Sequence, residues 1–500
     1  MKPRTTALIG VAAAIALVLS ACSSPSTTAS TNSSDATISI GSVYEPQNLD
    51  NTAGGGQGVT EALNGNVYEG LFKLADDGKV SKLLDKDYSI SPDGLTYTFT
   101  LRSGVKFHSG APLTSADVKY SIDKVTADAS QSARKSNFAI VKNIATPDDK
   151  TVVITLSSKS ISFIYNLSYI WIINHAATNL KTTEDGTGPY ELDVWKHGSS
   201  LSLKRFAGYW GTPAKNKEVV FHYFKDATAL NNALLTNAVD VVTSEQSPDA
   251  LSQFTSNADY KVNNGNSTTK LLLAFNDAKA PFNNVLVREA VTQAIDDKKL
   301  LSSIWGKYGT VTGSMVPPTD PWYEDLTSVH PYDPTVAKQE LAKAGFPKGF
   351  TFTLDTPNYD PHPAAAQFIK SELAKIGVTV NINIITPDEW YTKIYQNHDF
   401  VATMQEHVND RDVVFYGNPK FYWGYNNPKV TALINEAEQS DTTTEQTAKL
   451  KEANEQIVAD AASDWLYLYP QIVVASTKLS GYPLNGLNSQ FYAYDIVKKG

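Results

Sequence analysis

The 500-residue chain has one cysteine, Cys22, so no disulfide can form within it and any fold must be stabilised by packing. Shortly before Cys22 lies an uncharged apolar run over residues 7–19, and Lys2 and Arg4 precede that run. Its thirteen residues are too few to cross a bilayer, which requires about 20 apolar residues. A positive start followed by a short apolar run predicts a cleaved signal peptide over residues 1–21.

The residues around Cys22 resemble a bacterial lipobox. Leu19, Ser20 and Ala21 lie directly before the cysteine, and such small residues fit a lipoprotein-processing peptidase. In lipobox proteins the cysteine sulfur receives a diacylglyceryl group, and two or more acyl chains attach a protein stably to a membrane. The resemblance implies lipidation of Cys22 and a place on the outer face of the cell membrane, or in the periplasm if there is an outer membrane. An ordinary secretory signal or a buried free thiol is the alternative.

The segment after Cys22 lacks the large apolar side chains that form a core. Residues 22–35 are mostly Ser, Thr, Ala and Pro, so we expect a flexible tether there and folded structure from about Thr37. Removal of residues 1–21 changes the net charge from −9 to −11, which favours solubility and argues against nucleic-acid binding. The remaining length suffices for more than one core, and we expect a monomer that contacts the membrane only through its anchor.

Helical and strand patterns alternate along the rest of the chain, which predicts an α/β fold. Thr114 and Asp117 form a capping pair before a helix with Val118, Ile122 and Val125 on one face. The other expected elements are helices over about 334–344, 368–376 and 442–461 and strands over 97–101, 151–156 and 378–384.

Six ordered sequence blocks resemble one protein family. They are NVYEGL at 66–71, SPDGLTYTF at 91–99 with LRSGVKFHSG at 101–110, GTGPY at 186–190, YWG at 209–211, VREA at 287–290 with AID at 294–296, and LAKAG at 341–345. These blocks resemble the bacterial extracellular solute-binding proteins of the peptide/nickel class, family 5, which serve ABC importers. The resemblance implies a protein that captures a small ligand by lobe closure and delivers it to the ABC permease subunits. A short peptide is the leading ligand, and a nickel complex, an oligosaccharide or a carboxylate- or amine-bearing metabolite is the alternative.

The same resemblance implies the domain organisation. The expected fold is α/β and two-lobed, like that of periplasmic binding proteins (type II, cluster C), with an extra domain on the first lobe. Carried over to this sequence, lobe I comprises 36–62, 187–275 and 471–500, the extra domain 63–186, and lobe II 276–470. The two crossings between lobes, near Phe275 and Pro470, are the expected hinge, and closure around a ligand is the expected motion.

A secreted hydrolase is the competing class of function, and the sequence contains little that supports it. The G-x-S-x-G pattern of a serine nucleophile is absent, and no two of the histidines have the H-E-x-x-H spacing of a zinc site. The glycine-rich run 54–58 lacks the Lys-Ser/Thr pair of a phosphate-binding loop, so we interpret it as a flexible turn. We therefore expect a binding protein rather than an enzyme, with no cofactor and no metal held by the protein.

The segment 404–413 corresponds to the ligand-recognising segment of peptide-binding relatives, which reads roughly Asp-x-x-Asp-Pro. With Asp412 on the second aspartate, Asn409 takes the place of the residue that pairs with a peptide's terminal ammonium, and Asp410 follows it. This departure weakens the prediction of a free-amine peptide. Arg411 suits a carboxylate on the ligand, and an internal ion pair with Asp410 or Asp412 is the alternative.

Other candidate ligand contacts surround this segment. Tyr44 and Glu45 follow the alternating strand at 37–40, at the strand end where open sheets bind ligands. Aromatic walls suit apolar or ring-bearing ligands, and the run 421–425 supplies one. The remaining candidates are Glu406, His407, Tyr422, Trp423 and, more weakly, Trp390, for which packing under the strand 378–384 is the alternative.

Overall fold

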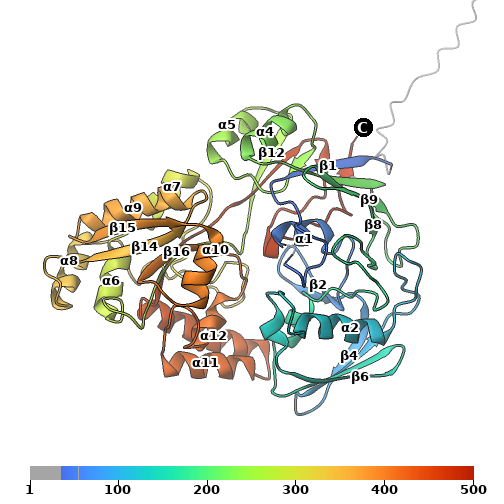
Figure 1. Cartoon of the computed structure of the whole chain (residues 1–500), viewed down its shortest axis with the longest axis horizontal. Coiled ribbons are helices and arrows are strands. Elements are labelled where there is room, and N and C mark those ends of the chain that lie inside the picture. Colours follow the sequence, from blue (N-terminus) through green and yellow to red (C-terminus); the bar gives the residue numbers. More distant parts are fainter. Residues whose placement is uncertain (1–34, 55, 500) are drawn as a thin grey trace, which may run out of the picture.

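The computed structural model describes residues 35–54 and 56–499 and shows two α/β bodies side by side (Figure 1). The signal peptide, the lipidation of Cys22 and most of the tether were predicted for residues that lie outside this described part. Within the described part, no helix combines the length and the apolar character needed to cross a membrane.

The first lobe, at the right of Figure 1, is built on a mixed sheet of seven strands. Its strands are β1 (Thr37–Ser42), β8 (Tyr190–Lys196), β9 (Ser200–Arg205), β10 (Glu218–Tyr223), β11 (Val241–Val242), β12 (Tyr260–Gly265) and β18 (Gln471–Ser476). They follow the order β12-β18-β11-β1-β10-β9-β8, and β1 runs parallel to both of its neighbours. Its helices and smaller elements are α1 (Gly56–Leu63), α4 (Ala227–Leu235), η2 (Pro248–Ala250), α5 (Leu251–Thr255), β19 (Leu479–Ser480), η5 (Leu487–Ser489) and β20 (Val497–Lys498).

The second lobe, at the left of Figure 1, is built on a sheet of five strands. Its strands are β13 (Lys270–Phe275), β14 (Thr351–Pro357), β15 (Thr379–Ile385), β16 (Ala402–His407) and β17 (Ser463–Leu468), in the order β15-β14-β16-β13-β17. Its helices are α6 (Val285–Gln293), α7 (Asp297–Trp305), α8 (Pro334–Lys343), α9 (His362–Ala374), α10 (Pro387–Trp390), η3 (Tyr391–Gln396), η4 (Asp412–Gly417), α11 (Pro428–Glu438) and α12 (Thr443–Ala459).

Strand β13 lies inside the second sheet, which corrects one predicted boundary. It pairs with β16 and β17, so the chain crosses between lobes before Lys270 and not near Phe275. All six of its side chains are buried, because Leu271 and Leu273 face one core and Leu272 and Ala274 face the other. A strand that is covered on both faces has a continuous apolar sequence, so the sequence does not show to which of the two sheets it belongs.

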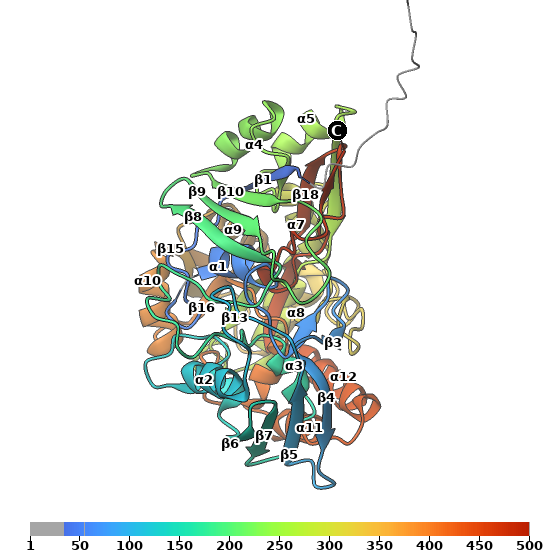
Figure 2. The same cartoon turned by 90° about the vertical axis from the view of Figure 1, so that its right-hand side faces the viewer.

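The extra domain packs at one end of the first lobe (Figure 2). Its elements are β2 (Phe72–Leu74), β3 (Val80–Lys82), β4 (Asp85–Ile90), β5 (Thr96–Leu101), α2 (Ser115–Thr126), η1 (Lys135–Phe138), β6 (Val141–Asp148), β7 (Thr151–Leu156) and α3 (Phe163–Leu167). Four of its strands form an antiparallel sheet, β4-β5-β7-β6, over a separate apolar core. As the capping pattern predicts, the Asp117 carboxylate accepts hydrogen bonds from the backbone N–H and the hydroxyl of Thr114 at 2.8 and 2.9 Å.

The predicted helices and strands are found close to their expected limits, except that α9 begins at His362 rather than near Phe368. Asp333 caps α8 through its carboxylate, and Gly345 follows the helix with a positive φ of 94°. The helix-to-strand step predicted around residue 377 is the step from α9 to β15. The α/β class is therefore confirmed, with local capping and alternation as its physical basis.

A buried ion pair attaches the loop after β16 to β13. The Lys270 ammonium lies 2.6 Å from Asp412 Oδ2, and both side chains are almost fully buried. Asp412 Oδ1 lies 3.1 Å from His407 Nδ1, and His407 Nε2 lies 2.8 Å from the Tyr422 hydroxyl. Burial alone would raise the pKa of Asp412, but Lys270 and His407 lower it below its usual value. The network holds residues 407–412 against the sheet of the second lobe.

We predict that Lys270→Met destabilises the protein by about 3–5 kcal/mol, because it leaves the Asp412 charge buried without its cation. Denaturant unfolding would measure the loss. The double variant Lys270→Met/Asp412→Leu should regain most of it, since apolar side chains can replace a buried pair. As the control, Lys429→Met removes an exposed pair with Glu452 at 3.3 Å and should cost less than about 1 kcal/mol. Equal effects of the two single variants would contradict the prediction.

Candidate functional site

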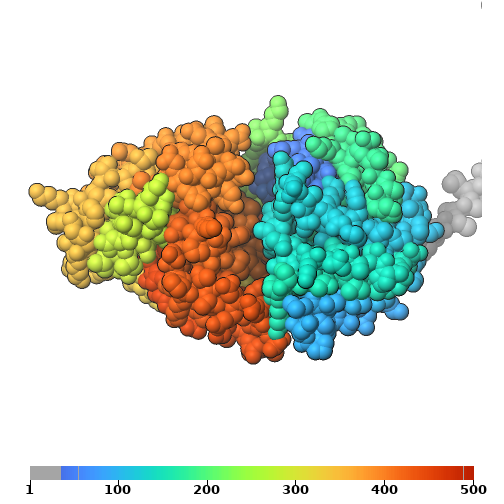
Figure 3. All heavy atoms as spheres, turned by 60° about the horizontal axis from the view of Figure 1, so that its bottom comes forward, coloured from blue at the N-terminus to red at the C-terminus, as the bar shows by residue number. Residues whose placement is uncertain are grey.

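A cavity of about 440 Å³ lies between the two lobes, where their surfaces meet along the seam in Figure 3. The first lobe contributes Tyr44, Gln57 and Glu61, and the second lobe contributes Tyr359 and Glu406. Other lining residues are Thr243, Ser244, Gln246, Ser267, Thr269, Trp305, Asp360, Gln405, Val408, Tyr469, Pro470, Gln471, Gly486, Ser489, Gln490 and Phe491. Both lobes and both crossings between them therefore contribute to its walls.

The start of α1 and the loop after β1 form the first-lobe wall. They approach so closely that a Cβ on Gly58 would lie 2.2 Å from the Tyr44 carbonyl oxygen, so only glycine fits there. The glycine-rich run interpreted from the sequence as a flexible turn thus leads into a helix that faces the cavity. Gln57 and Glu61, four residues apart, project from one face of that helix toward the cavity.

A second cavity of about 390 Å³ continues the first toward the extra domain. The two share Gln57, Val408 and Ser489, and the second is also lined by Arg134, Tyr169, Trp171 and Asn409 among others. Together they form one inter-lobe space that extends from the crossings to the extra domain.

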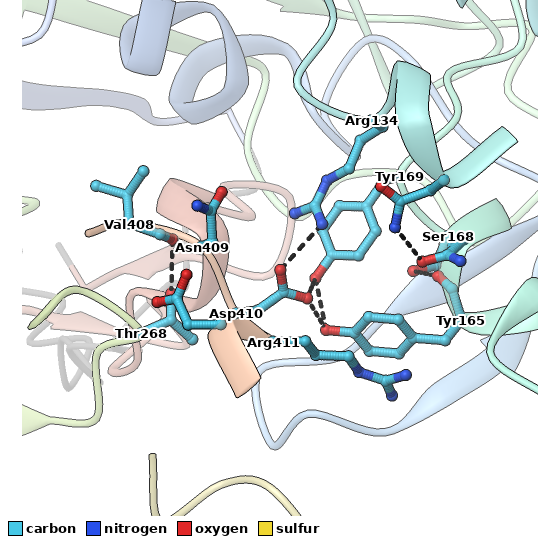
Figure 4. Close-up of polar contacts among 12 residues, drawn as sticks. Arg134, Tyr165, Ser168, Tyr169, Thr268, Val408, Asn409, Asp410 and Arg411 are labelled. Carbon is cyan, nitrogen blue, oxygen red and sulfur yellow. Dashed lines mark hydrogen bonds and ion pairs between the residues drawn. The ribbon is translucent and has the colours of Figure 1, made fainter. Parts of the chain in front are cut away.

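The far end of this space is closed by a polar cluster that we call the latch: Asp410 with Arg134, Tyr165 and Tyr169 (Figure 4). Arg134 Nη1 lies 2.9 Å from Asp410 Oδ1, and the Tyr169 hydroxyl donates to Asp410 Oδ2 at 2.8 Å. The Tyr165 hydroxyl donates to the same oxygen. Asp410 belongs to the second lobe and the other three to the extra domain, so the latch joins the second lobe to the extra domain.

The electrostatics of the latch favour an ionised Asp410. Burial alone would raise its pKa, but the Arg134 guanidinium and the Tyr165 hydroxyl hold it well below the usual range. The Arg134 guanidinium also lies over the Tyr169 ring, 3.7 Å from its centroid. The carboxylate that follows the family's ammonium-binding position is therefore already occupied by a cation of the protein itself.

Further contacts extend this closed interface along the extra domain. The Ile161 N–H donates to the Glu438 carbonyl oxygen at 2.9 Å, and the Ser162 hydroxyl donates to Glu438 Oε2 at 2.7 Å. Arg411 Nη1 donates to Ser162 Oγ at 3.0 Å, with its guanidinium 3.5 Å from the Tyr165 ring centroid. An ion pair of Arg411 with Asp410 or Asp412 was the alternative predicted from the sequence. In the structure Asp410 pairs with Arg134 instead, and Asp412 pairs with Lys270.

The structure separates the predicted site residues into two groups. Tyr44, Glu406 and Asn409 line the inter-lobe space, and Asp410 and Arg411 lie at its closed end. His407, Asp412, Tyr422 and Trp423 instead lie in the interior of the second lobe, the last two within 2% of full burial. We correct the assignment of these four residues to packing and to the Lys270 network.

Two further candidates also have structural roles. Glu45 lies outside both cavity walls, and its Oε1 accepts a hydrogen bond from the Gly198 N–H at 2.7 Å. The Trp390 indole is buried in the second-lobe core and donates to Thr403 Oγ1 at 2.9 Å, which agrees with the packing alternative.

For several lining residues, no pattern in the sequence indicated that they belong to a binding site. Glu61 lies on α1, whereas Tyr359 and Tyr469 lie in the loops after β14 and β17, and only the tertiary structure brings them to one wall. Arg134 likewise lies 276 positions from Asp410 in the sequence. In the described part of the chain, no group of three or more His, Cys, Asp or Glu side chains is placed to hold a metal ion.

Comparison with known sequences gives two related findings. The family model described as bacterial extracellular solute-binding proteins, family 5 Middle, matches residues 79–410. The glutathione-binding protein GsiB of Salmonella typhimurium is 30% identical over 370 residues, which cover 70% of this chain and 69% of that protein.

Solved structures share the fold across nearly the whole chain. The binding protein AgaA from A. tumefacien R10, in complex with agropinic acid, has a TM-score of 0.79 at 23% identity and covers 93% of this chain and 99% of its own. DppA from Helicobacter pylori, in complex with the peptide STSA, has a TM-score of 0.78 at 23% identity and covers 93% and 98%. At these identities the likeness concerns the fold.

The latch predicts a shift of the lobe equilibrium in Asp410→Asn. The variant loses charge-assisted hydrogen bonds of about 1.5–3 kcal/mol, so the ratio of closed to open protein should fall roughly 10- to 150-fold. Small-angle scattering should show a larger radius of gyration for the variant than for the wild type without added solute.

The matched control is Asp441→Asn, which removes a more exposed ion pair with Lys159 across the same interface. An exposed pair contributes less than about 1 kcal/mol, so this variant should scatter like the wild type. Identical scattering from Asp410→Asn and the wild type would exclude a latch function.

Proposed function

The chain belongs to the bacterial extracellular solute-binding proteins of family 5, and we propose that it captures a small solute in the cavity between its lobes and delivers it to an ABC permease. Membership of the family confirms the resemblance carried by the six sequence blocks, and it makes the chain the solute-binding component of an ABC importer. The single observation that supports the site is the 440 Å³ cavity with walls from both lobes. A solute there contacts both lobes at once and therefore favours the closed arrangement.

A short peptide is the leading candidate for the solute. GsiB is named for glutathione, and DppA is bound to the peptide STSA. The two connected cavities have the elongated form that an extended peptide needs, and glutamine, serine and threonine side chains along the walls offer partners to peptide groups.

A non-peptide solute is the second candidate, and the latch is the observation that favours it. A peptide ammonium has no free acceptor at Asp410, because Arg134, Tyr165 and Tyr169 surround that carboxylate. AgaA, which shares the fold, is bound to agropinic acid. The family and its structural neighbours are binding proteins rather than enzymes, so we expect binding without turnover.

The anchor is the second part of the proposed function, and it rests on the residues before Cys22. We propose that Cys22 is lipidated and that the mature protein lies outside the cytoplasm at the membrane, as a monomer that meets the permease there.

Cys22→Ala should abolish the lipid anchor, because the variant has no cysteine sulfur to which a diacylglyceryl group can be attached. Fractionation of cells should show the variant in the medium or periplasm, or as an unprocessed precursor in the membrane. Ser33→Ala, in the expected tether, is the control and should fractionate like the wild type. A Cys22→Ala protein that is processed and still membrane-bound would refute the anchor.

Solute capture predicts stabilisation that depends on the cavity. With a pool of dipeptides and tripeptides at 100 times the dissociation constant, unfolding should be opposed by about 2.7 kcal/mol more than without solute. Thermal unfolding would measure this shift, and scattering should show a more compact particle.

A blocking variant makes the test specific. Ser244→Trp places a large ring in the cavity wall and should abolish the stabilisation, whereas Ser252→Trp, on the exposed side of α5, should not. Stabilisation that survives Ser244→Trp would place the site elsewhere, and turnover of the peptides would make the protein an enzyme.

A further inference from the structure

We propose that the captured solute carries a positively charged group, an ammonium or a guanidinium, which binds to Glu406 of the second lobe and faces Glu61 of the first. The inference rests on the proposed function, because it names the chemical class of the solute that fills the same cavity.

The charge of the cavity wall is the first observation. Of the 21 residues that line the larger cavity, Glu61, Asp360 and Glu406 are acidic, and in the described part of the chain none of the 21 is lysine, arginine or histidine. Arg134, which lines the adjoining cavity, pairs with Asp410, and Lys270 pairs with Asp412. An anionic solute would meet repulsion in this wall, and a cation would meet attraction.

The lack of partners for these acids is the second observation. No hydrogen bond or ion pair within residues 35–54 and 56–499 reaches the Glu406 carboxylate, and burial alone raises its pKa to about 7. Glu61 is only 5% exposed, accepts a hydrogen bond from Ser42 Oγ at 2.6 Å, and also has a pKa raised by burial to about 7. Glu61 is buried and Glu406 is half-buried. Charges removed from water are normally paired with an opposite charge, and within the described residues neither carboxylate has a cation as its partner.

Other polar atoms of the same wall are only partly satisfied. The Thr243 and Tyr469 hydroxyls and Gln405 Oε1 are buried, and within the described residues they make no hydrogen bond of normal geometry. Their polar neighbours are Glu61, Tyr467 and Tyr359, respectively. Buried polar atoms are normally hydrogen-bonded in folded proteins, so the convergence of these groups on one cavity is consistent with a polar solute that bonds to them.

The aromatic side chains around Glu406 are the third observation. The charge of Glu406 raises the pKa of Tyr44, Tyr359 and Tyr469, so all three rings lie within its electrostatic reach. Burial is the larger cause for each, and Glu61 adds to the effect on Tyr44. Aromatic faces attract cations through their quadrupoles, so tyrosines beside a carboxylate suit an ammonium or a guanidinium.

The position of the two acids links ligand charge to closure. Glu61 lies on α1 of the first lobe and Glu406 on β16 of the second, so a cation between them is attracted by both lobes only when the lobes are closed. The free energy of ionising Glu61 and Glu406 then becomes part of the preference for positively charged solutes.

The test compares solutes that carry a positive group with solutes that do not. The probes are a pool of dipeptides and tripeptides that have free amino groups and lack arginine and histidine, the same pool after complete N-acetylation, the amines putrescine, agmatine and choline, and the uncharged and anionic solutes glucose and succinate. We expect the melting temperature to rise with the free-amine pool or an amine and to stay unchanged with the acetylated pool, glucose and succinate.

The outcomes separate the two proposals. Equal stabilisation by the free and acetylated pools, or stabilisation by glucose or succinate alone, would contradict the inference that the solute carries a positive group. Either result would still support solute capture in the cavity. No stabilisation by any probe contradicts solute capture itself and the inference with it.

Two variants then locate the positive group. Glu406→Gln and Glu61→Gln should each lower the affinity for the best cationic probe at least ten-fold, whereas the exposed Glu455→Gln should not change it. Glu406→Asp keeps the charge and should keep the preference for free over acetylated amines. Without solute, both glutamine variants should melt at or above the wild-type temperature at pH 8, because each removes a carboxylate that has no cation as its partner and whose ionisation is opposed by removal from water. Folded glutamine variants that bind the cationic probe like the wild type would overturn the assignment.

Discussion

Much of the cleft depends on how the charges at the end of β16 and in the loop after it are neutralised. The segment from Glu406 to Asp412 carries three carboxylates and one guanidinium, and three of these four groups contact a different neighbour in the described chain. Asp412 turns inward to Lys270, Asp410 crosses to Arg134 of the extra domain, and Arg411 lies over Tyr165. Glu406 alone faces the cavity without a partner from the described chain. The same short segment therefore anchors itself, joins the lobes and leaves one charge for the solute.

The direction of each of these side chains follows from simple backbone geometry. Glu406 and His407 are consecutive residues of β16, so they point to opposite faces of the second sheet, one toward the cavity and the other into the core. His407 then meets Tyr422 and Asp412, and this interior contact holds the outward-facing residue in place. Ligand selectivity and interior packing are thus set by neighbouring positions of one strand.

The sequence predicted the fold more completely than the site, for physical reasons. Capping pairs such as Thr114 with Asp117 are local, and so are alternating strands such as β15, so both can be recognised without tertiary structure. The density of aromatic residues in the run 421–425 does not show whether these side chains face the core or a ligand, because large rings suit both places. In the structure Trp423 lies in the core. The partner of Asp410 and the cavity face of α1 depend on contacts between distant segments. The boundary at β13 was misplaced because a strand buried on both faces fits either sheet.

The position of β18 in the first sheet also sets the order in which the chain can be assembled. This strand lies between β12 and β11, so the sheet has a gap at its interior until residues 471–476 have been synthesised. The extra domain and the five-stranded sheet contain no residue beyond Leu468 and can form before that point. The lobe that begins first in the sequence is consequently completed last, when the carboxyl-terminal strand enters between its neighbours. Truncation shortly before residue 471 would leave two unpaired strand edges inside a sheet, and such edges are the ones at which chains associate with one another.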